Sequence, residues 1–290
     1  MKPAPFKYLR PGTLPEALEA LEAEGGMARI LAGGQSLVPM LHMRLMQPSA
    51  LIDINRTSGL DDVRTEGSTT VLGPMVRYAT IEHSAILSER LPLLSCVVRY
   101  IGDLQVRNRG TVGGSLAQAD PTGEMPLACL ALGAVIETST ASARREIAMD
   151  EFLLGSYTTA LEPEEMITGI RIPIAPDSFA FLERSRKHND FAVINVAALG
   201  RSNGGGRWTD LRIALGGVNE HAVLAREAAQ LLEGTELEDE AIVEAAQLAL
   251  EVADPPDDVR ASAEYRRHLV PIYVFRALEK LRQDGQNGYG

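Results

Sequence analysis

The chain has 290 residues, 45% of them hydrophobic and 23% charged, which is ordinary for a soluble globular protein and long enough for two or three packed units with a large core. Its formal charge of −11, from 28 basic and 39 acidic side chains, argues against a nucleic-acid surface, which should be basic. No segment approaches the roughly 18 uninterrupted apolar residues of a membrane span, and the N-terminus shows no export signal, so we expect a cytoplasmic protein without a membrane span.

The first 45 residues predict alternating strands and helices around a glycine turn. Residues 6–10 are expected to form a short strand, and Thr13-Leu-Pro-Glu16 has the pattern of a capping box that begins a helix, which Gly25-Gly26 ends. The apolar run from Ala28 to Ala32 predicts a buried strand. It leads directly into a Gly-Gly turn and an apolar helix from about Ser36 to Leu45.

The middle of the chain predicts further strands at 51–54 and 69–75, and a long helical stretch between Ala79 and Gly102 that breaks at Pro92. Residues 103–121 show little periodicity, and an irregular segment of that length in a compact domain is usually functional or disordered. A helix from Met125 to Leu132 follows. Strands are then expected near 134–138, 146–149 and 167–172.

The last third predicts a smaller α+β unit after a linker at 172–178. Three strands are expected at 179–184, 192–200 and 209–216, with Asn203-Gly-Gly-Gly206 as a hairpin turn between the last two. Helices at about 221–232, 238–252 and 262–282 end the chain. We therefore expect two domains, residues 1–175 and 178–284.

Two glycine turns, whose Gly-Gly pairs lie 80 residues apart, carry the strongest functional signal. Each has a Gly-Gly pair followed by serine, in Ala32-Gly-Gly-Gln-Ser36 and Thr111-Val-Gly-Gly-Ser115. Glycine permits positive φ and close approach to the backbone, and successive free N–H groups in such turns can bind an anion. Either turn alone reads equally well as a tight turn at a strand end. Together they predict a site in which the two turns hold opposite sides of one diphosphate.

Catalytic and metal motifs are missing from the sequence. The five histidines are scattered and form no H-E-x-x-H, and the two cysteines, Cys96 and Cys129, lie in apolar segments that predict burial. Two cysteines exclude an iron–sulfur cluster with four cysteine ligands on this chain alone. No G-x-S-x-G is present, so Ser36 and Ser115 are interpreted as hydroxyl donors beside a phosphate.

The sequence segments that contain the two turns, residues 32–41 and 107–121, closely resemble the FAD-pyrophosphate loops of one protein family. This family is the medium, flavin-binding subunit of the molybdenum hydroxylases (carbon monoxide, nicotine, quinoline and xanthine dehydrogenases). The resemblance runs from about Phe6 to about Arg282. The resemblance implies an α+β fold: an FAD-binding domain of the vanillyl-alcohol-oxidase-like type, followed by a small domain with a three-stranded sheet and helices.

The resemblance also assigns positions to FAD. The two turns would hold the diphosphate, and Asp120 or Glu124 the ribose and adenosine side. The isoalloxazine walls would be Leu72, Leu161 and Phe191, of which Phe191 is the sharpest candidate. Many relatives carry a lysine before the loop that leads to Phe191, where this chain has Leu182-Glu183. The assigned positions are Leu31, Ala32, Gly33, Gly34, Gln35, Ser36, Leu37, Leu72, Thr111, Val112, Gly113, Gly114, Ser115, Asp120, Glu124, Leu161 and Phe191.

The function that the resemblance implies is electron transfer. A large molybdenum-cofactor subunit would oxidise the substrate, a small subunit with [2Fe–2S] clusters would pass the electrons on, and FAD on this chain would deliver them to an external acceptor, in a dimer of heterotrimers. Two alternatives stay open at this point: a self-contained FAD-dependent oxidoreductase of the same superfamily, for which Tyr157 or Asp190 would be the acid or base, and a flavin-free scaffold subunit.

Overall fold

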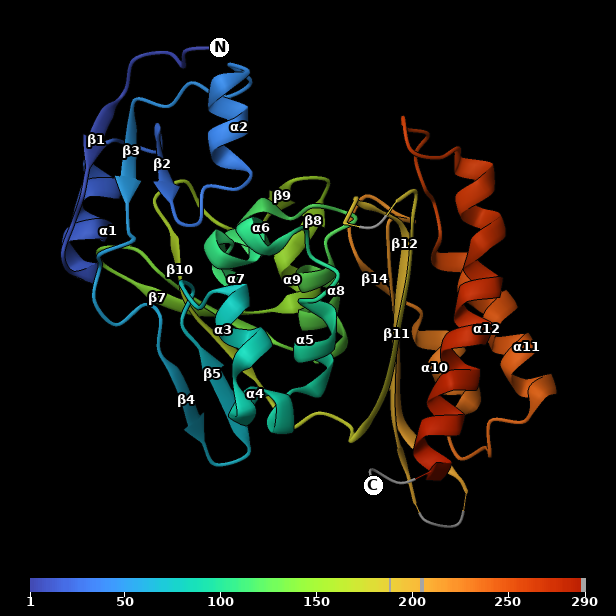
Figure 1. Cartoon of the computed structure of the whole chain (residues 1–290). Coiled ribbons are helices and arrows are strands. Elements are labelled where there is room, and N and C mark those ends of the chain that lie inside the picture. The colour runs from blue at the N-terminus through green and yellow to red at the C-terminus, as the bar shows by residue number, and fades with distance from the viewer. Residues whose placement is uncertain (188, 204–205, 288–290) are drawn as a thin grey trace.

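The computed structural model describes residues 1–187, 189–203 and 206–287. An N-terminal lobe carries a three-stranded parallel sheet in the order β1-β3-β2 (Figure 1). The predicted capping box is confirmed, because Thr13 Oγ1 accepts from the Glu16 amide and Glu16 Oε2 accepts from the Thr13 amide. The elements of the lobe are β1 (Lys7–Leu9), α1 (Leu14–Ala23), β2 (Ala28–Leu31), α2 (Leu37–His42) and β3 (Ala50–Asp53).

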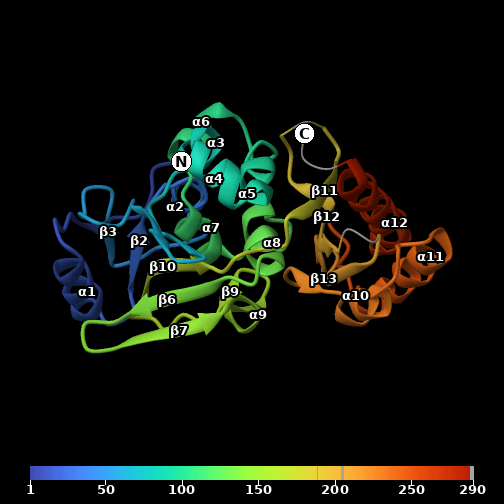
Figure 2. The ribbon, with the colours of Figure 1, turned by 90° about the horizontal axis from the view of Figure 1, so that it is seen from below.

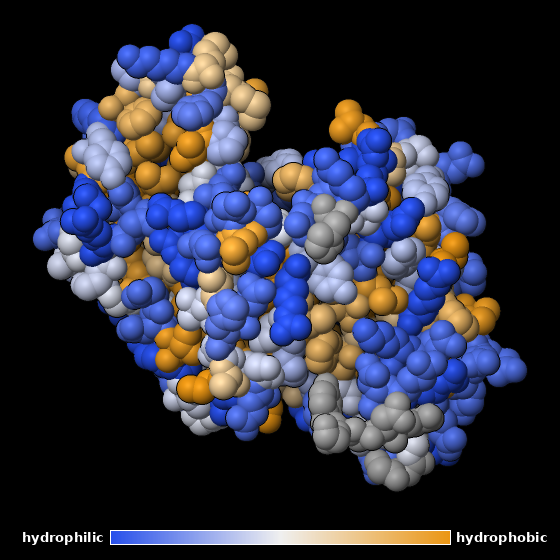
Figure 3. Space-filling model, viewed as in Figure 1, coloured by the Kyte–Doolittle hydropathy of each residue, from blue (hydrophilic) through white to orange (hydrophobic). Residues whose placement is uncertain are grey.

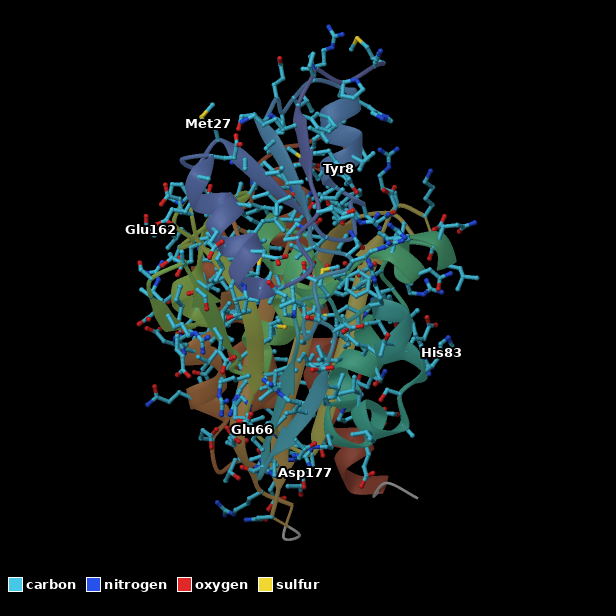
Figure 4. The ribbon with its side chains drawn as sticks, turned by 90° about the vertical axis from the view of Figure 1, so that its left-hand side faces the viewer. Tyr8, Met27, Glu66, His83, Glu162 and Asp177 are labelled. Carbon is cyan, nitrogen blue, oxygen red and sulfur yellow. The ribbon has the colours of Figure 1, made fainter. Side chains whose placement is uncertain are left out.

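A second, antiparallel sheet of five strands has the order β4-β5-β10-β6-β7. The N-terminal lobe rests against the loop that precedes β10, since a Cβ on Gly26 would lie 2.7 Å from Pro163 Cβ. Figure 4 shows Met27 and Glu162 on this same side of the molecule. The strands are β4 (Val63–Glu66), β5 (Thr69–Leu72), β6 (Val135–Ser139), β7 (Arg144–Ala148) and β10 (Met166–Ile172), with a small pair β8 (Leu153–Gly155) and β9 (Thr158–Thr159).

Short helices fill the space beside this sheet, and two predictions need correction here. The helical stretch predicted for 79–102 is three separate helices, because the Ser84 side chain caps a second start and Pro92 begins a third. The segment 103–121, predicted to be irregular, contains two helices whose N-caps are the side chains of Asp103 and Thr111. The helices are α3 (Tyr78–His83), α4 (Ala85–Arg90), α5 (Pro92–Val97), α6 (Leu104–Arg109), α7 (Val112–Gln118), α8 (Glu124–Ala131) and α9 (Met149–Phe152).

The C-terminal sheet has four strands in the order β11-β12-β13-β14, not the three that were expected. The fourth is the pair Val223–Leu224, which takes up the start of the helix predicted at 221–232. Part of the predicted turn at 203–206 lies outside the described residues. The elements are β11 (Ser178–Ser185), β12 (Ala192–Ser202), β13 (Trp208–Gly216), β14 (Val223–Leu224), α10 (Arg226–Leu232), α11 (Asp239–Leu248), a 3₁₀ turn (Ala249–Val252) and α12 (Ala263–Asn287).

The C-terminal sheet is buried on both faces. Along β12, Val196 and Ala198 join the core beneath α10, α11 and α12, whereas Ala197 and Leu199 join the core that contains α5 and α8. Figure 2 shows the sheet between these two sets of helices. The two-domain division therefore stays a prediction, because one sheet contributes to both cores. Cys129 is fully buried, as expected, and Cys96 is only half-buried. None of the described helices is long and apolar enough to cross a membrane.

A buried ion pair fixes the loop before β10. Glu165 receives Arg145 Nη2 at 2.6 Å, the Thr138 hydroxyl at 2.5 Å and the Glu162 amide at 2.9 Å. Burial alone would raise the pKa of Glu165, but these donors outweigh burial and lower it to about 2. The pair connects β6, β7 and the residues that lead into β10.

We expect Glu165→Gln to lower the free energy of unfolding at pH 7 by about 1–2 kcal/mol, a figure discounted because Arg145 is half-exposed. The depressed pKa means that the stabilisation is present above about pH 4.3 and is lost as the pH falls toward 2. Urea unfolding at pH 7 and pH 3 should therefore show a smaller difference at pH 3. Lys7→Met, which removes an exposed ion pair with Glu24, is the control and should have no measurable effect. An equal loss at both pH values would contradict this account.

Candidate functional site

The two glycine turns lie in direct contact. A Cβ on Gly33 would stand 2.3 Å from the Arg109 carbonyl oxygen and 3.0 Å from Gly110 Cα, and a Cβ on Gly114 would stand 3.6 Å from Ala32 Cβ. Only a residue without a Cβ permits such an approach of backbone to backbone at Gly33. Gly34 is needed for its conformation, with φ at +74°. The prediction that both turns belong to one site is consistent with this contact.

The first turn presents a run of free amides. Within the described chain, the six N–H groups from Ala32 to Leu37 have no hydrogen-bond acceptor. The residues are half-buried or exposed, and the Ser36 side chain makes no capping bond. Consecutive unbonded amides with few carbonyls beside them form a concave site for an anion. The turn itself carries no charged side chain.

Carbonyl groups of this turn accept hydrogen bonds from specific donors. Asn55 Nδ2 donates to the Leu31 and Ala32 carbonyls, at 3.3 and 2.9 Å, and the Val38 amide donates to the Gly34 carbonyl at 3.0 Å. Gln35 Nε2 donates to the Gly33 carbonyl at 3.1 Å, and its contact with the phosphate stays a prediction. The carbonyls from Leu31 to Gly34 therefore accept hydrogen bonds, whereas the N–H groups from Ala32 to Leu37 have no acceptor in the described chain.

The second turn is built differently, and its part in holding the diphosphate stays a prediction. Its amides are already used: Val112 donates to the Val76 carbonyl, Gly113 to the Pro74 carbonyl, Gly114 to Thr111 Oγ1 and Ser115 to the Thr111 carbonyl. The reason is the capped helix α7, whose first turn takes up these groups. Of Thr111 to Ser115, only the Thr111 amide has no acceptor in the described chain, and Gly114 and Ser115 keep exposed surface.

A pair of polar side chains that the sequence analysis missed joins the two turns. Arg77 Nη2 donates to Asn55 Oδ1 at 2.6 Å, and Arg77 Nη1 donates to the Arg109 carbonyl. Asn55 also binds the buried Asp53 at 2.6 Å, and Asp53 accepts from the hydroxyl of Tyr8, which Figure 4 labels on the N-terminal lobe. Burial alone would raise the pKa of Asp53, but the donors Tyr8 and Asn55 lower it. The position of Asn55 directly after strand β3 was the only feature of the sequence that could have indicated its role. No feature of the sequence indicated the role of Arg77.

Several predicted residues gather at the other end of α7, beside the C-terminal sheet. Asp120 accepts from the Tyr157 hydroxyl at 3.4 Å, and Arg260, whose charge acts on Tyr157, stacks 4.5 Å over the ring of Phe191. Phe191 is 52% exposed, so one surface of its ring is open to a ligand. Figure 3 shows the molecule hollowed between the lobe that carries α2 and the upper end of the C-terminal sheet.

Two of the predicted ring walls fare differently. Leu161 packs on the core and keeps part of its surface exposed. Leu72 is completely buried in the same core and has no surface on which a flavin ring could lie, so we withdraw this residue from the site. Its strand position next to Gly73 explains the burial, because β5 lies inside the five-stranded sheet.

The segment from Asp120 to Glu124 is held by the C-terminal sheet. The Gly217 amide donates to the Pro121 carbonyl at 2.8 Å, and Asn195 Nδ2 donates to the Thr122 carbonyl at 3.0 Å. Burial raises the pKa of Glu124, and repulsion from Asp120 adds to the effect. Burial likewise raises the pKa of Glu183 on β11, to about 8, with repulsion from Glu124 as the second cause. Among the described residues, no group of three or more His, Cys, Asp or Glu side chains could hold a metal ion.

Two family profiles cover nearly the whole chain. Residues 4–175 match the FAD binding domain in molybdopterin dehydrogenase, and residues 179–281 match the CO dehydrogenase flavoprotein C-terminal domain. The chain belongs to this flavoprotein family. It is a medium subunit of the molybdenum hydroxylases, and its cofactor is FAD.

Relatives of the molybdenum hydroxylase medium subunits match along their full length. The nicotine 6-hydroxylase medium subunit of Paenarthrobacter nicotinovorans is 36% identical over 278 residues, which is 96% of this chain and 98% of that protein. Carbon monoxide dehydrogenase from Hydrogenophaga pseudoflava superimposes with a TM-score of 0.93 at 37% identity, covering 97% of this chain and 98% of that chain. Quinoline 2-oxidoreductase from Pseudomonas putida 86 superimposes with a TM-score of 0.93 at 35% identity, covering 98% and 99%.

The contact between the turns predicts the effect of a single methyl group. We expect Gly33→Ala to lower the free energy of unfolding by about 1–3 kcal/mol and to abolish retention of FAD, because the new Cβ meets backbone atoms that have little freedom to move. Gly12→Ala is the control, since its Cβ would lie 3.6 Å from the nearest atom, a flexible carboxylate. Urea unfolding and flavin absorbance measure the two effects. A Gly33→Ala protein as stable and as yellow as the control would refute the close approach.

The bridge between the turns predicts a loss of affinity. Arg77→Met should weaken FAD binding at least tenfold, about 1.4 kcal/mol, because the second turn loses its link to Asn55 and the free amides lose their alignment. Arg90→Met is the matched control: Arg90 also binds a turn carbonyl, that of Gly67 between β4 and β5, and the Thr70 hydroxyl, so its hydrogen bonds involve neither glycine turn. Fluorescence titration of the deflavinated chain gives both affinities. Equal losses in the two variants would show that Arg77 has no special role.

Proposed function

We propose that the amides from Ala32 to Leu37 hold the FAD diphosphate, with the second turn supplying the Thr111 amide, the Ser115 hydroxyl and the close packing that its glycines permit. The observation that carries this assignment is the row of six N–H groups that have no acceptor among the described residues, in a turn where the carbonyls from Leu31 to Gly34 accept hydrogen bonds. The phosphate charge would be stabilised by backbone dipoles, since the turn has no cation.

We place the isoalloxazine end at Leu161 and Phe191. Asp120 and Glu124 were expected on the ribose and adenosine side, but Tyr157 and Arg260 connect Asp120 to the neighbourhood of Phe191. Both acids therefore belong, in our assignment, to the ring end of the site. Leu161 and the open surface of Phe191 would shield the ring from water, which matters because FAD, when bound, supplies the redox chemistry.

We further propose that the chain works in a cytoplasmic complex with a small [2Fe–2S] subunit and a large molybdenum-cofactor subunit, as a dimer of heterotrimers that serves an external electron acceptor. The support comes from its relatives, which are named as medium chains and as subunits of dehydrogenase complexes. In this role the chain binds and insulates the group that carries electrons, and the substrate is oxidised on another subunit.

Purification of the tagged chain from its native host tests this proposal. An iron–sulfur protein and a larger molybdenum protein should co-purify with it, and metal analysis of the complex should give iron and molybdenum alongside flavin. The isolated chain, loaded with FAD, should oxidise none of the substrates that the complex oxidises. A chain that elutes alone and carries out the full oxidation by itself would contradict the subunit role and favour a self-contained oxidoreductase.

A further inference from the structure

Two buried oxygen acceptors lie without a donor where the C-terminal sheet holds the segment from Asp120 to Glu124. Glu183 on β11 and Asn195 on β12 are direct partners in the antiparallel register, so their side chains lie on the same face of the sheet. Glu183 Oε2 and Asn195 Oδ1 are both closed to solvent and have no hydrogen-bond partner. Asn195 Nδ2 reaches the Thr122 carbonyl, and the Glu124 carboxyl group lies against Glu183.

Among the residues that the structure describes, no cation acts on Glu124 or Glu183. The titratable groups that act on Glu124 are Asp120, Glu183 and Tyr78, and those that act on Glu183 are Glu124 and Tyr100. All of them are acids, and they lie on α3, after α5, after α7, on α8 and on β11. Two ionised carboxylates buried side by side would repel each other strongly, and a buried acceptor without a donor is costly.

We propose that Glu124 and Glu183 share one proton, and that this proton joins the C-terminal sheet to the 120–124 segment of the cofactor site. Glu183 carries the proton and donates it to the Glu124 carboxylate, as in other close carboxyl pairs that titrate as a unit. Loss of the proton leaves two like charges between α8 and β11 and pushes the segment away from the sheet. The raised pKa values of both groups agree with this arrangement. The link to the cofactor rests on the proposed function.

The test uses the full-length chain with Glu183→Gln, because glutamine keeps the shape and supplies a permanent N–H donor. Infrared spectroscopy of the FAD-free protein should show the C=O band of a protonated carboxyl group near pH 6.5, which disappears by about pH 9 and is missing from the variant. Thermal unfolding gives a second readout. Because the pKa of Glu183 is raised in the folded protein, the wild type loses stability as the pH rises from about 4.3, the ordinary pKa of glutamate, to about 8. The stability of the variant relative to the wild type should therefore increase over this range.

The cofactor arm measures the dissociation constant of FAD itself. In the wild type it should rise roughly tenfold between pH 6.5 and pH 9, and in Glu183→Gln it should change less than about twofold. Glu146→Gln, on the exposed face of β7, is the control and should behave as the wild type. Glu183→Lys is a second variant, in which a cation replaces the proton, and it should also bind FAD with little dependence on pH.

A carboxyl band that persists unchanged in Glu183→Gln, or identical pH profiles of unfolding in the variant and the wild type, would overturn the shared proton. FAD affinity that is independent of pH in the wild type would overturn its link to the cofactor segment. A chain that binds no FAD at all would defeat the proposed function, whereas the infrared and unfolding measurements on the flavin-free protein would still decide whether the proton is shared.

Discussion

The approach of Gly33 to the backbone of Arg109 and Gly110 is the constraint on which the site depends. It joins the turn after β2 to the residues between α6 and α7, far away in sequence, and it leaves no room for even a methyl group between them. Asn55 and Arg77 make the contact specific, because one binds the carbonyls of the first turn and the other binds a carbonyl of the second, and they bind each other. The carbonyls from Leu31 to Gly34 all accept hydrogen bonds, which leaves the free N–H groups of the first turn available to bind a ligand.

The C-terminal sheet completes the site instead of standing apart from it. Gly217 and Asn195 bind the carbonyls of Pro121 and Thr122, and the buried Arg266 on α12 in turn binds the Gly217 carbonyl at 2.7 Å. A continuous set of hydrogen bonds therefore runs from the last helix, through the sheet, to the segment that follows α7. Burial of the sheet on both faces makes this connection rigid, since neither set of helices can move without disturbing a packed core.

Sequence reasoning succeeded where the cause is local and failed where it is tertiary. The capping box at Thr13 and the apolar strands of the C-terminal sheet follow from short patterns, and the pairing of the two turns follows from their unusual glycines. The helices at 104–118 were missed because their stability comes from side-chain caps at Asp103 and Thr111 and not from apolar periodicity. Those same caps consume the amides of the second turn. Leu72 was misplaced, and Arg77 and Asn195 were overlooked, because strand order alone decides which side chains meet at the junction.

The electrostatics of the site follow from how few charges it uses. The chain has a net charge of −11, and the first turn, which we propose holds the doubly charged diphosphate, has no lysine or arginine of its own. Arg77 is committed to Asn55 and the Arg109 carbonyl. Backbone dipoles bind such an anion without bringing a mobile cation into the site. Cations are also scarce at the other end of α7, where none of the described residues supplies a positive partner for Asp120, Glu124 and Glu183. An anionic cofactor placed nearby can only strengthen the repulsion among these acids. Proton uptake by the Glu124–Glu183 pair is the one compensation that the described side chains there offer, which makes binding of the anion and retention of the proton favour each other.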